Sequence, residues 1–376
     1  MAKSSNKNLR NAARNKKDEF YTQFNDIQKE IEAYLDYNID TFRDKVVYCN
    51  CDDPYESNFF RYFVLNFGRL GLKRLITTSY KPSPIANTQL ELFGDDKTLT
   101  PKKGRPKITA NRFMIINEVG DIDDDGEFNL KDVALLLRQN KNNEWKPLEE
   151  NGDFRSDECI ELLKQADIVV TNPPFSLFRE FVAHLMEYDK KFLILGNSNA
   201  ITYKEIFPLI KDNKLWLGYS IHSGDVEFRV PNYYEVRSSS LRIDEKGNKY
   251  IRVPSIRWFT NLDHGRRHQP LSLMTARDNK KFNKQLRKKE NSYQNYDNYN
   301  AIEVPYTNAI PSDYNGVMGV PITFLDKYNP DQFEILGNSN VKGEREHLMN
   351  NTKSATDCTY IKGKPQYARI LIKHKK

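Results

Sequence analysis

The first two hundred residues alternate between short apolar, β-branched runs and longer stretches in which apolar residues recur at helical spacing. The apolar runs predict buried strands at 46–49, 75–78, 113–116, 168–170 and 191–195. The amphipathic stretches predict helices at 27–37, 56–66, 158–166, 176–188 and 203–210. Strands that alternate with helices are typical of βαβ units, so the pattern predicts an α/β fold with a parallel sheet.

The pattern changes after Trp216, where short strands, tyrosines and turns replace the alternation of strand and helix. We therefore expect a boundary between residues 210 and 225, with one domain at 18–215 and an α+β region at 216–376. A polar, basic tail at 1–17 precedes the domain, and residues from about 81 to 150 are expected to form an insertion in it.

The composition favours a globular protein with a sizeable core, because 38% of its 376 residues are hydrophobic and 12% are aromatic. No apolar run is long enough to cross a bilayer, and residues 1–17 lack the apolar segment of a secretory signal. The cysteines are too few and scattered for a disulfide framework, and Cys49-Asn50-Cys51 lacks the spacing of a zinc or redox motif. We expect a protein of the reducing cytoplasm.

The charge is modest overall, at +7, but it is concentrated in basic runs. The runs lie at 3–17, 102–107, 266–267 with 277–289, and 362–376. Such runs are usually solvated surfaces or tails. Here tyrosines lie among them, which favours contacts with the phosphates of nucleic acid.

The segment with the most specific chemistry is the end of the strand at 168–170, which continues into Asn172-Pro173-Pro174-Phe175. The prolines end the strand because they lack an N–H donor and fix φ. The four residues therefore come at the carboxyl end of a parallel strand, where ligands bind in open α/β sheets. A plain strand-ending turn is the alternative interpretation.

This tetrapeptide suits the methylation of an amino group on a planar base. Such an amine is a poor nucleophile, since its lone pair is delocalised into the ring. The side-chain oxygen of Asn172 and the carbonyl of Pro173 could accept both amine hydrogens and stabilise the developing positive charge, while Phe175 stacks on the base. The nitrogen becomes acidic only after the methyl arrives, so neither a general base nor a metal is needed.

Several segments, taken in order, resemble the EcoRI-type family of adenine-specific DNA methyltransferases, also called modification methylases. The matching stretches are 18–23, 46–54, 152–156, 167–176, 201–205, 216–218 and 313–325, with the clearest gap between 80 and 151. The resemblance implies a Rossmann-like S-adenosylmethionine-dependent methyltransferase domain at 18–215 and a target-recognition region at 216–376. It also implies a site-specific DNA adenine-N6 methyltransferase.

The resemblance also implies cofactor contacts, which are carried over residue by residue. The segment expected at the methionine end of the cofactor supplies Phe20, Tyr21 and Thr22. The segment expected at the amino group and ribose supplies Asn50, Asp52 and Asp53, and the segment expected at the adenine supplies Asp153 and Phe154. Acids replace the usual glycine-rich loop after the first strand, so the resemblance does not assign separate cofactor contacts to Asp52 and Asp53. For Asp153 and Phe154 the alternative is a helix-capping acid beside a core ring.

The implied partner is double-stranded DNA, whose target adenine must be flipped out of the duplex to reach Asn172. Tyr203 and Lys204 could contact the flipped nucleotide, although the start of a surface helix explains them equally well. Candidates for guanine or phosphate contacts are Arg266 and Arg267, together with Arg229, Arg237, Arg242, Arg252 and Arg257. A cognate restriction endonuclease and an orphan enzyme are both compatible with the sequence, and we expect a monomer.

One acidic segment matches the first half of a calcium-binding EF-hand loop, with Asp121, Asp123, Asp125 and Gly126 at the expected spacing. The twelfth position is Asp132 instead of Glu, and an acidic turn is the favoured interpretation. Two other function classes also remain open: methylation of RNA or of a protein glutamine, and a non-catalytic DNA-binding protein that retains the fold.

Overall fold

The computed structural model describes residues 22–51, 57–79, 112–122, 124–126, 128–129, 132–133, 135–136, 142–150, 152–221, 225–230, 241–288, 293–341, 344, 349 and 358–375. The chain divides into two compact units. The first unit consists of Met1–Ser198 and Ser223–Leu262, and the second consists of Asn199–His222 and Asp263–Lys376. Among the described residues, no helix combines the length and apolar character needed to span a bilayer.

The first unit is built on a mixed sheet whose strands run in the order β4-β3-β2-β1-β5-β6-β11. The four central strands are parallel: β2 (Arg74–Thr78), β1 (Val46–Cys49), β5 (Ile168–Thr171) and β6 (Lys191–Asn197). Three antiparallel strands flank them: β3 (Arg112–Ile116), β4 (Glu144–Pro147) and β11 (Ile256–Thr260). Strands β1 and β5 are buried at every position, as expected for strands covered on both faces.

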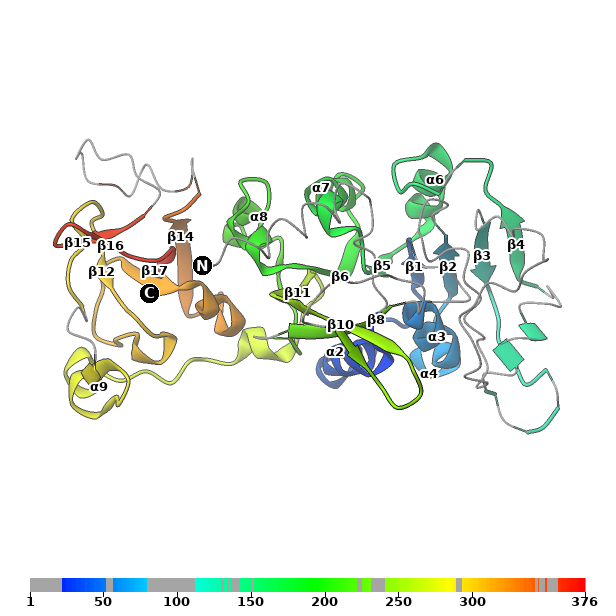
Figure 1. Ribbon diagram of the computed structural model, residues 1–376, viewed down its shortest axis with the longest axis horizontal. Coiled ribbons are helices and arrows are strands. Elements are labelled where there is room, and N and C mark those ends of the chain that lie inside the picture. Colours follow the sequence, from blue (N-terminus) through cyan, green and yellow to red (C-terminus); the bar gives the residue numbers. More distant parts are fainter. Residues whose placement is uncertain are drawn as a thin grey trace. The chain divides into compact units, whose positions relative to one another are not determined.

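Helices cover both faces of this sheet (Figure 1). On one face lie α2 (Phe24–Tyr37), α3 (Asn58–Leu65) and α4 (Phe67–Leu70), and on the other lie α6 (Asp157–Gln165) and α7 (Phe178–Glu187). Serine caps begin two of them, since the hydroxyls of Ser57 and Ser156 accept from the first backbone N–H groups of α3 and α6. A short 3₁₀ turn, η1 (Phe175–Leu177), joins β5 to α7.

A second, antiparallel sheet in the first unit has the order β8-β10-β9. Its strands are β8 (Asp225–Val230), β10 (Lys249–Pro254) and β9 (Leu241–Ile243). Burial alternates along β8 and β10, so one face is apolar and the other polar. Ser255, with φ of 63°, turns the chain from β10 directly into β11.

The second unit contains a sheet in the order β12-β13-β17-β14 and the β15-β16 hairpin. The sheet strands are β12 (Ile302–Glu303), β13 (Met318–Pro321), β17 (Arg369–His374) and β14 (Phe333–Asn338), and the hairpin strands are β15 (Tyr360–Ile361) and β16 (Lys364–Pro365). The remaining elements are α8 (Phe207–Lys211), β7 (Trp216–Leu217), η3 (Gly265–His268), α9 (Ala276–Phe282), η4 (Leu286–Lys288), η5 (Thr307–Ala309) and η6 (Ile322–Lys327), while η2 (Ser198–Thr202) begins at the passage from the first unit.

A buried polar network lies inside the sheet of the second unit. Arg369 on β17 donates from Nη2 and Nε to the carboxylate of Glu303 on β12, at 2.5 and 2.9 Å. The hydroxyl of Tyr296 donates to the same carboxylate. Gly319 on β13 leaves the space for that ring, because a Cβ there would lie 2.2 Å from the Tyr296 hydroxyl oxygen.

The predicted α/β class is confirmed, and so are the predicted strands and the helices at 27–37, 56–66, 158–166 and 176–188, apart from shifts at their ends. The helix predicted at 203–210 is wrong in its first turn, since α8 begins only at Phe207. Pro208, in the first turn of α8, has no N–H to donate to the carbonyl of Lys204, so a regular helix cannot run through from Tyr203. The functional division at residue 216 stays a prediction, whereas the compact units assign 223–262 to the first unit.

Candidate active site

Strand β5 carries the Asn172-Pro173-Pro174-Phe175 segment to the carboxyl edge of the main sheet. It lies between its parallel neighbours β1 and β6, so the segment emerges near the middle of the sheet. Both prolines are buried, whereas Asn172 and Phe175 remain partly exposed. The backbone turns at Pro174, whose carbonyl accepts from the N–H of Leu177 at 2.9 Å. The prolines thus anchor the segment and leave the ring of Phe175 partly exposed, whereas the side-chain oxygen of Asn172 is itself buried.

Asn50, at the end of β1, connects the strand ends on both sides of it. Its side chain accepts from the Thr78 hydroxyl on β2 at 3.2 Å, and its carbonyl accepts from the Thr171 hydroxyl on β5. Thr78 also shares a 3.1 Å hydrogen bond with Tyr48, whose burial raises the pKa of the phenol well above its usual value. Cys51 then takes a left-handed conformation with φ of 65°. Asp52 and Asp53, which follow, lie outside the described residues.

Gly152 brings the loop that carries Asp153 against the end of β2. Its φ is +74°, and a Cβ at this position would lie 2.1 Å from the carbonyl oxygen of Ser79. Only glycine combines that backbone conformation with that close approach. The loop is therefore fixed at the same carboxyl edge that holds Asn50.

Asp153 presents a carboxylate that Arg155 orients. It accepts from the backbone N–H, Nε and Nη2 of Arg155 at 3.0, 2.9 and 2.7 Å, and these bonds raise the pKa of the guanidinium. The side chain of Asp153 is 16% exposed. Ser156, and not Asp153, caps α6, so the alternative of a capping acid is wrong.

Phe154 packs into the core beneath α7. Its ring is 2% exposed and meets the rings of Phe181 and His184 edge-on, at centroid distances of 5.0 and 5.7 Å. Burial lowers the pKa of His184. The structure thus gives Phe154 the core role weighed as an alternative above, and its contact with a cofactor stays a prediction.

Thr22 is the described part of the predicted methionine-end segment, since Phe20 and Tyr21 lie outside the described residues. It is 3% exposed, and its carbonyl accepts from the side chain of Asn58 at the start of α3, at 2.7 Å. Its hydroxyl is buried and makes no hydrogen bond with any residue that the structure describes. The chain entering α2 is thus held at the helix that follows β1.

Comparison with known proteins identifies the family. The family model "Adenine-specific methyltransferase EcoRI" matches residues 8–375. Over 375 residues the chain is 43% identical to the Type II methyltransferase M.EcoRI of Escherichia coli, covering 99% of this chain and 98% of that protein. The chain belongs to this family of adenine-specific methyltransferases.

Two further relatives of this EcoRI-family methyltransferase are Type II methyltransferases of mycoplasmas. M.MpnI of Mycoplasma pneumoniae is 35% identical over 370 residues, 97% of each chain. M.MgeORF184P of Mycoplasma genitalium is 34% identical over 368 residues, 96% of this chain and 97% of that protein. No solved structure matches the chain.

In the second unit of this EcoRI-family methyltransferase, the residues predicted to contact DNA lie in two places. Tyr203 and Lys204 occupy the turn before α8, where the carbonyl of Tyr203 accepts from the N–H of Phe207 at 2.9 Å. The Lys204 side chain is 78% exposed, with its nearest carboxylate, that of Glu205, at 3.9 Å. Lys204 is therefore available to a polyanion, and its contact with DNA stays a prediction.

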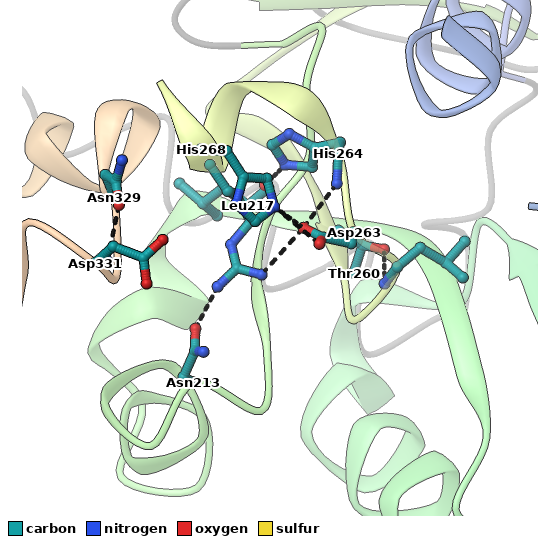
Figure 2. Close-up of polar contacts among 10 residues, drawn as sticks. Asn213, Leu217, Thr260, Asp263, His264, His268, Asn329 and Asp331 are labelled. Carbon is teal, nitrogen blue, oxygen red and sulfur yellow. Dashed lines mark hydrogen bonds and ion pairs between the residues drawn. The ribbon is translucent and has the colours of Figure 1, made fainter. Parts of the chain in front are cut away.

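Arg266 and Arg267 join the turn η3 to the segment around β7. Figure 2 shows this region, where the ring of His264 bonds to the carbonyl of Leu217. Arg267 is 7% exposed, lies 3.5 Å over the ring of Trp216 and donates to the side chain of Asn213. Arg266 lies 4.1 Å over the ring of Tyr219 and donates to its carbonyl at 2.7 Å. Arg267 thus has little surface to offer DNA, whereas Arg266 is partly exposed.

The acidic loop expected to be a turn or a calcium site is held by its own carboxylates. Asp121 accepts from the N–H groups of Asp125 and Gly126 at 3.2 and 2.6 Å, and Asp132 accepts from that of Ile122 at 2.6 Å. Asp123 lies outside the described residues, and among those described no cluster of three or more His, Cys, Asp or Glu could hold a metal ion. These hydrogen bonds account for the acidic pattern as a turn.

Proposed function

We propose that this EcoRI-family methyltransferase transfers the methyl group of S-adenosylmethionine to N6 of an adenine in double-stranded DNA, at a specific sequence. The observation that carries the proposal is the position of Asn172-Pro173-Pro174-Phe175 directly after β5, with the prolines buried and Asn172 and Phe175 partly exposed. The family is adenine-specific, and the relatives are named Type II methyltransferases.

The residues at the carboxyl edge fit the cofactor. S-adenosylmethionine presents an ammonium group, ribose hydroxyls and an adenine amine, all of which need acceptors. The edge supplies the carboxylate of Asp153, the amide of Asn50 and the Thr22 hydroxyl, which has no hydrogen-bond partner among the described residues. These residues would hold the cofactor, together with Phe20, Tyr21, Asp52, Asp53 and Phe154. When bound, the cofactor supplies an electrophilic methyl group.

Asn172 and Pro173 would activate the target amine. The side-chain oxygen of Asn172 and the carbonyl of Pro173 accept its two hydrogens, which localises the nitrogen lone pair and stabilises the positive charge that develops. Because the two prolines are buried and fix the backbone, the acceptors are already in place before the base arrives. Phe175 would stack on the purine, and its partial exposure leaves a ring face for that contact.

An adenine in a duplex reaches this site only by rotating out of the helix, which costs a few kcal/mol. We infer that residues of 216–376, with Tyr203 and Lys204, hold the DNA during that step, and that the protein acts as a monomer. A Type II methyltransferase of this kind would protect DNA against a cognate endonuclease that cleaves the same sequence when it is unmethylated.

Transfer of tritiated methyl groups tests the proposal. The full chain is incubated with labelled S-adenosylmethionine and duplex DNA, with RNA and with protein, and the products are digested and separated. We expect label in N6-methyladenine from duplex DNA alone, and sequencing of modified bases then gives the site. Label in RNA or in a protein glutamine would show that the substrate is RNA or protein instead of DNA. Binding of DNA without methyl transfer would indicate a non-catalytic DNA-binding protein.

A further inference from the structure

Two arginines of the first unit, Arg61 on α3 and Arg229 on β8, have no counter-ion among the residues that the structure describes. The Nε–H group of each is buried and makes no hydrogen bond with any described residue. Arg229 donates from Nη2 to the neutral side chain of Asn248 at 2.8 Å. Within the described ranges, neither guanidinium forms an ion pair with a carboxylate.

The two guanidinium groups lie close enough to repel each other. Burial lowers the pKa of Arg61, and the positive charge of Arg229 lowers it further. Arginine nevertheless stays charged in proteins. Two partly buried like charges without a counter-ion destabilise a fold, so the arrangement indicates an anion that binds between or beside them.

Several other arginines of the same unit are neutralised by carboxylates, whereas Arg74 donates to the neutral amides of Asn117 and Gln165. Arg69 pairs with Glu32 at 2.6 Å, Arg155 with Asp153 at 2.7 Å, and Arg242 with Glu227 at 2.5 Å. Unlike Arg74, both members of the Arg61–Arg229 pair also have a buried Nε–H group without a hydrogen-bond partner among the described residues.

The polar face of the β8-β10-β9 sheet extends from Arg229. Arg229 is directly opposite Tyr250 in the register, and Tyr250 is opposite Arg242, whose guanidinium lies 4.3 Å over the tyrosine ring. In the next row Arg252 is opposite Glu227. The same face carries two acids, Glu227, which bonds to Arg242, and Asp244, which accepts from the Tyr250 hydroxyl. A row of arginine donors beside the Arg61–Arg229 pair suits an extended polyanion better than a single small anion.

We propose that the Arg61–Arg229 pair binds a backbone phosphate of DNA, with the polar face of β8-β10-β9 continuing the contact. The planar, forked donors of arginine match phosphate oxygens, and a phosphate would accept from the Nε–H groups, which have no hydrogen-bond partner in the described part of the chain. The inference rests on the proposed function, because it takes duplex DNA as the substrate. It assigns DNA contact to the first unit, which also carries Asn172.

Salt-dependent DNA binding tests the proposal with Arg61→Met, Arg229→Met and the control Arg69→Met, whose arginine is already paired with Glu32. Affinity for a fluorescent random-sequence duplex is measured over a salt series, which needs no knowledge of the recognition sequence. We expect the slope of log K against log salt to fall by about 0.9 for each lost phosphate contact, and affinity at low salt to fall about tenfold. Arg69→Met should keep the slope, the affinity for S-adenosylmethionine and kcat, whereas Arg61→Met and Arg229→Met should keep the affinity for S-adenosylmethionine.

Thermal unfolding separates a binding role from a structural one. Removing one of two repelling cations should raise Tm in the absence of DNA, and inorganic phosphate should stabilise the wild type more than either Met variant at matched ionic strength. An unchanged salt slope in both folded variants would overturn the proposal, as would failure of both variants to fold. Weaker S-adenosylmethionine binding with an unchanged slope would assign the pair to the cofactor carboxylate instead. Failure of the proposed function would appear differently, as absence of methyl transfer by the wild type.

Discussion

At the scale of single residues, the site depends on small polar side chains that hold strand ends in register. Asn50 is 2% exposed. Its side-chain oxygen accepts from Thr78 on β2 and its carbonyl accepts from Thr171 on β5, the strands on either side of β1. Its packing therefore fixes the spacing between the cofactor edge and the Asn172 segment. Asn50 can therefore affect cofactor binding in two ways, by fixing the positions of the strand ends and by contacting the cofactor itself.

Replacement of Asn172 by Ala tests the acceptor role directly. We expect kcat for DNA methylation to fall on the order of 100- to 1000-fold, as when one preorganised hydrogen-bonding group is removed from an active site. Binding of S-adenosylmethionine, measured by calorimetry, should be unchanged. Asn38→Ala, which removes an exposed amide after α2, is the control. Turnover near the wild-type rate in Asn172→Ala would show that the amine is activated in another way.

Replacement of Gly152 by Ala should damage both stability and cofactor binding. The new Cβ would meet the Ser79 carbonyl oxygen at 2.1 Å in a backbone with φ of +74°, so the loop must move at a cost of about 1–3 kcal/mol. Gly247→Ala is a matched control, because Gly247 has φ of +80° but open space around it. We expect thermal unfolding to show the larger loss for Gly152→Ala, and only that variant to bind S-adenosylmethionine more weakly. Equal losses would mean that the contact with Ser79 is unimportant.

The sequence predicts the parts of the site that are contiguous and leaves out those that depend on distant contacts. Asn172-Pro-Pro-Phe175 could be found because one short segment contains both the strand and its chemistry. The hydrogen bond from Thr171 to Asn50 joins residues 121 positions apart, and no periodicity reveals it. The burial of Arg267 likewise follows from Trp216 and Asn213, which basic patterning alone does not show.

At the scale of elements, the buried network of Glu303, Arg369 and Tyr296 sets the packing of β12 against β13 and β17. The carboxylate accepts from both partners inside the sheet, and burial raises the pKa of Tyr296, so its hydroxyl stays a donor. Burial of any one of these three polar side chains without its partners would destabilise the fold. The network therefore specifies which strands meet.

Breaking this network should lower the free energy of unfolding more than breaking an exposed ion pair does. Glu303→Gln leaves the Arg369 charge buried without a counter-ion, and we expect a loss of about 3–5 kcal/mol in the free energy of unfolding. Glu227→Gln removes an exposed partner of Arg242 and should cost less than about 1 kcal/mol. Urea unfolding measures both, and adding Arg369→Met to Glu303→Gln should recover part of the loss. A loss no larger than that of Glu227→Gln would show that the pair contributes nothing to stability.

Elements were predictable where the pattern is local and strong. The parallel strands β1, β5 and β6 have apolar runs because both faces of the sheet are covered. The pairing of β11 with β6 could not be predicted, since it is antiparallel and joins segments separated by an entire second sheet. The short strands of the second unit, such as β12 and β16, carry too few residues to show a period.

At the scale of the whole molecule, the two compact units are interleaved in sequence. The chain passes between them after Ser198, after His222 and after Leu262. The first unit therefore contains β8, β9, β10 and β11, although these follow the predicted boundary at residue 216. A cut at that boundary would remove β11, whose residues are all buried against β6.

A fragment of residues 1–215 should consequently fail to fold cooperatively, whereas a fragment of residues 1–262 keeps every strand of the main sheet in the first unit. Loss of β11 exposes apolar positions of β6 and deletes Trp258, a fully buried side chain of this unit. Urea unfolding followed by near-ultraviolet circular dichroism compares the fragments with the full chain. A cooperative transition for 1–215 like that of 1–262 would show that the strand is dispensable.

The interleaving also has a consequence during synthesis on the ribosome. Strand β6 is complete at Asn197, but its neighbour β11 begins only at Ile256. With roughly 60 residues still to be added, the delay is roughly 3–12 s at typical elongation rates. Throughout that interval the apolar edge of β6 has no partner strand, so the nascent chain is open to capture by a chaperone or to pairing with the same edge of a neighbouring nascent chain.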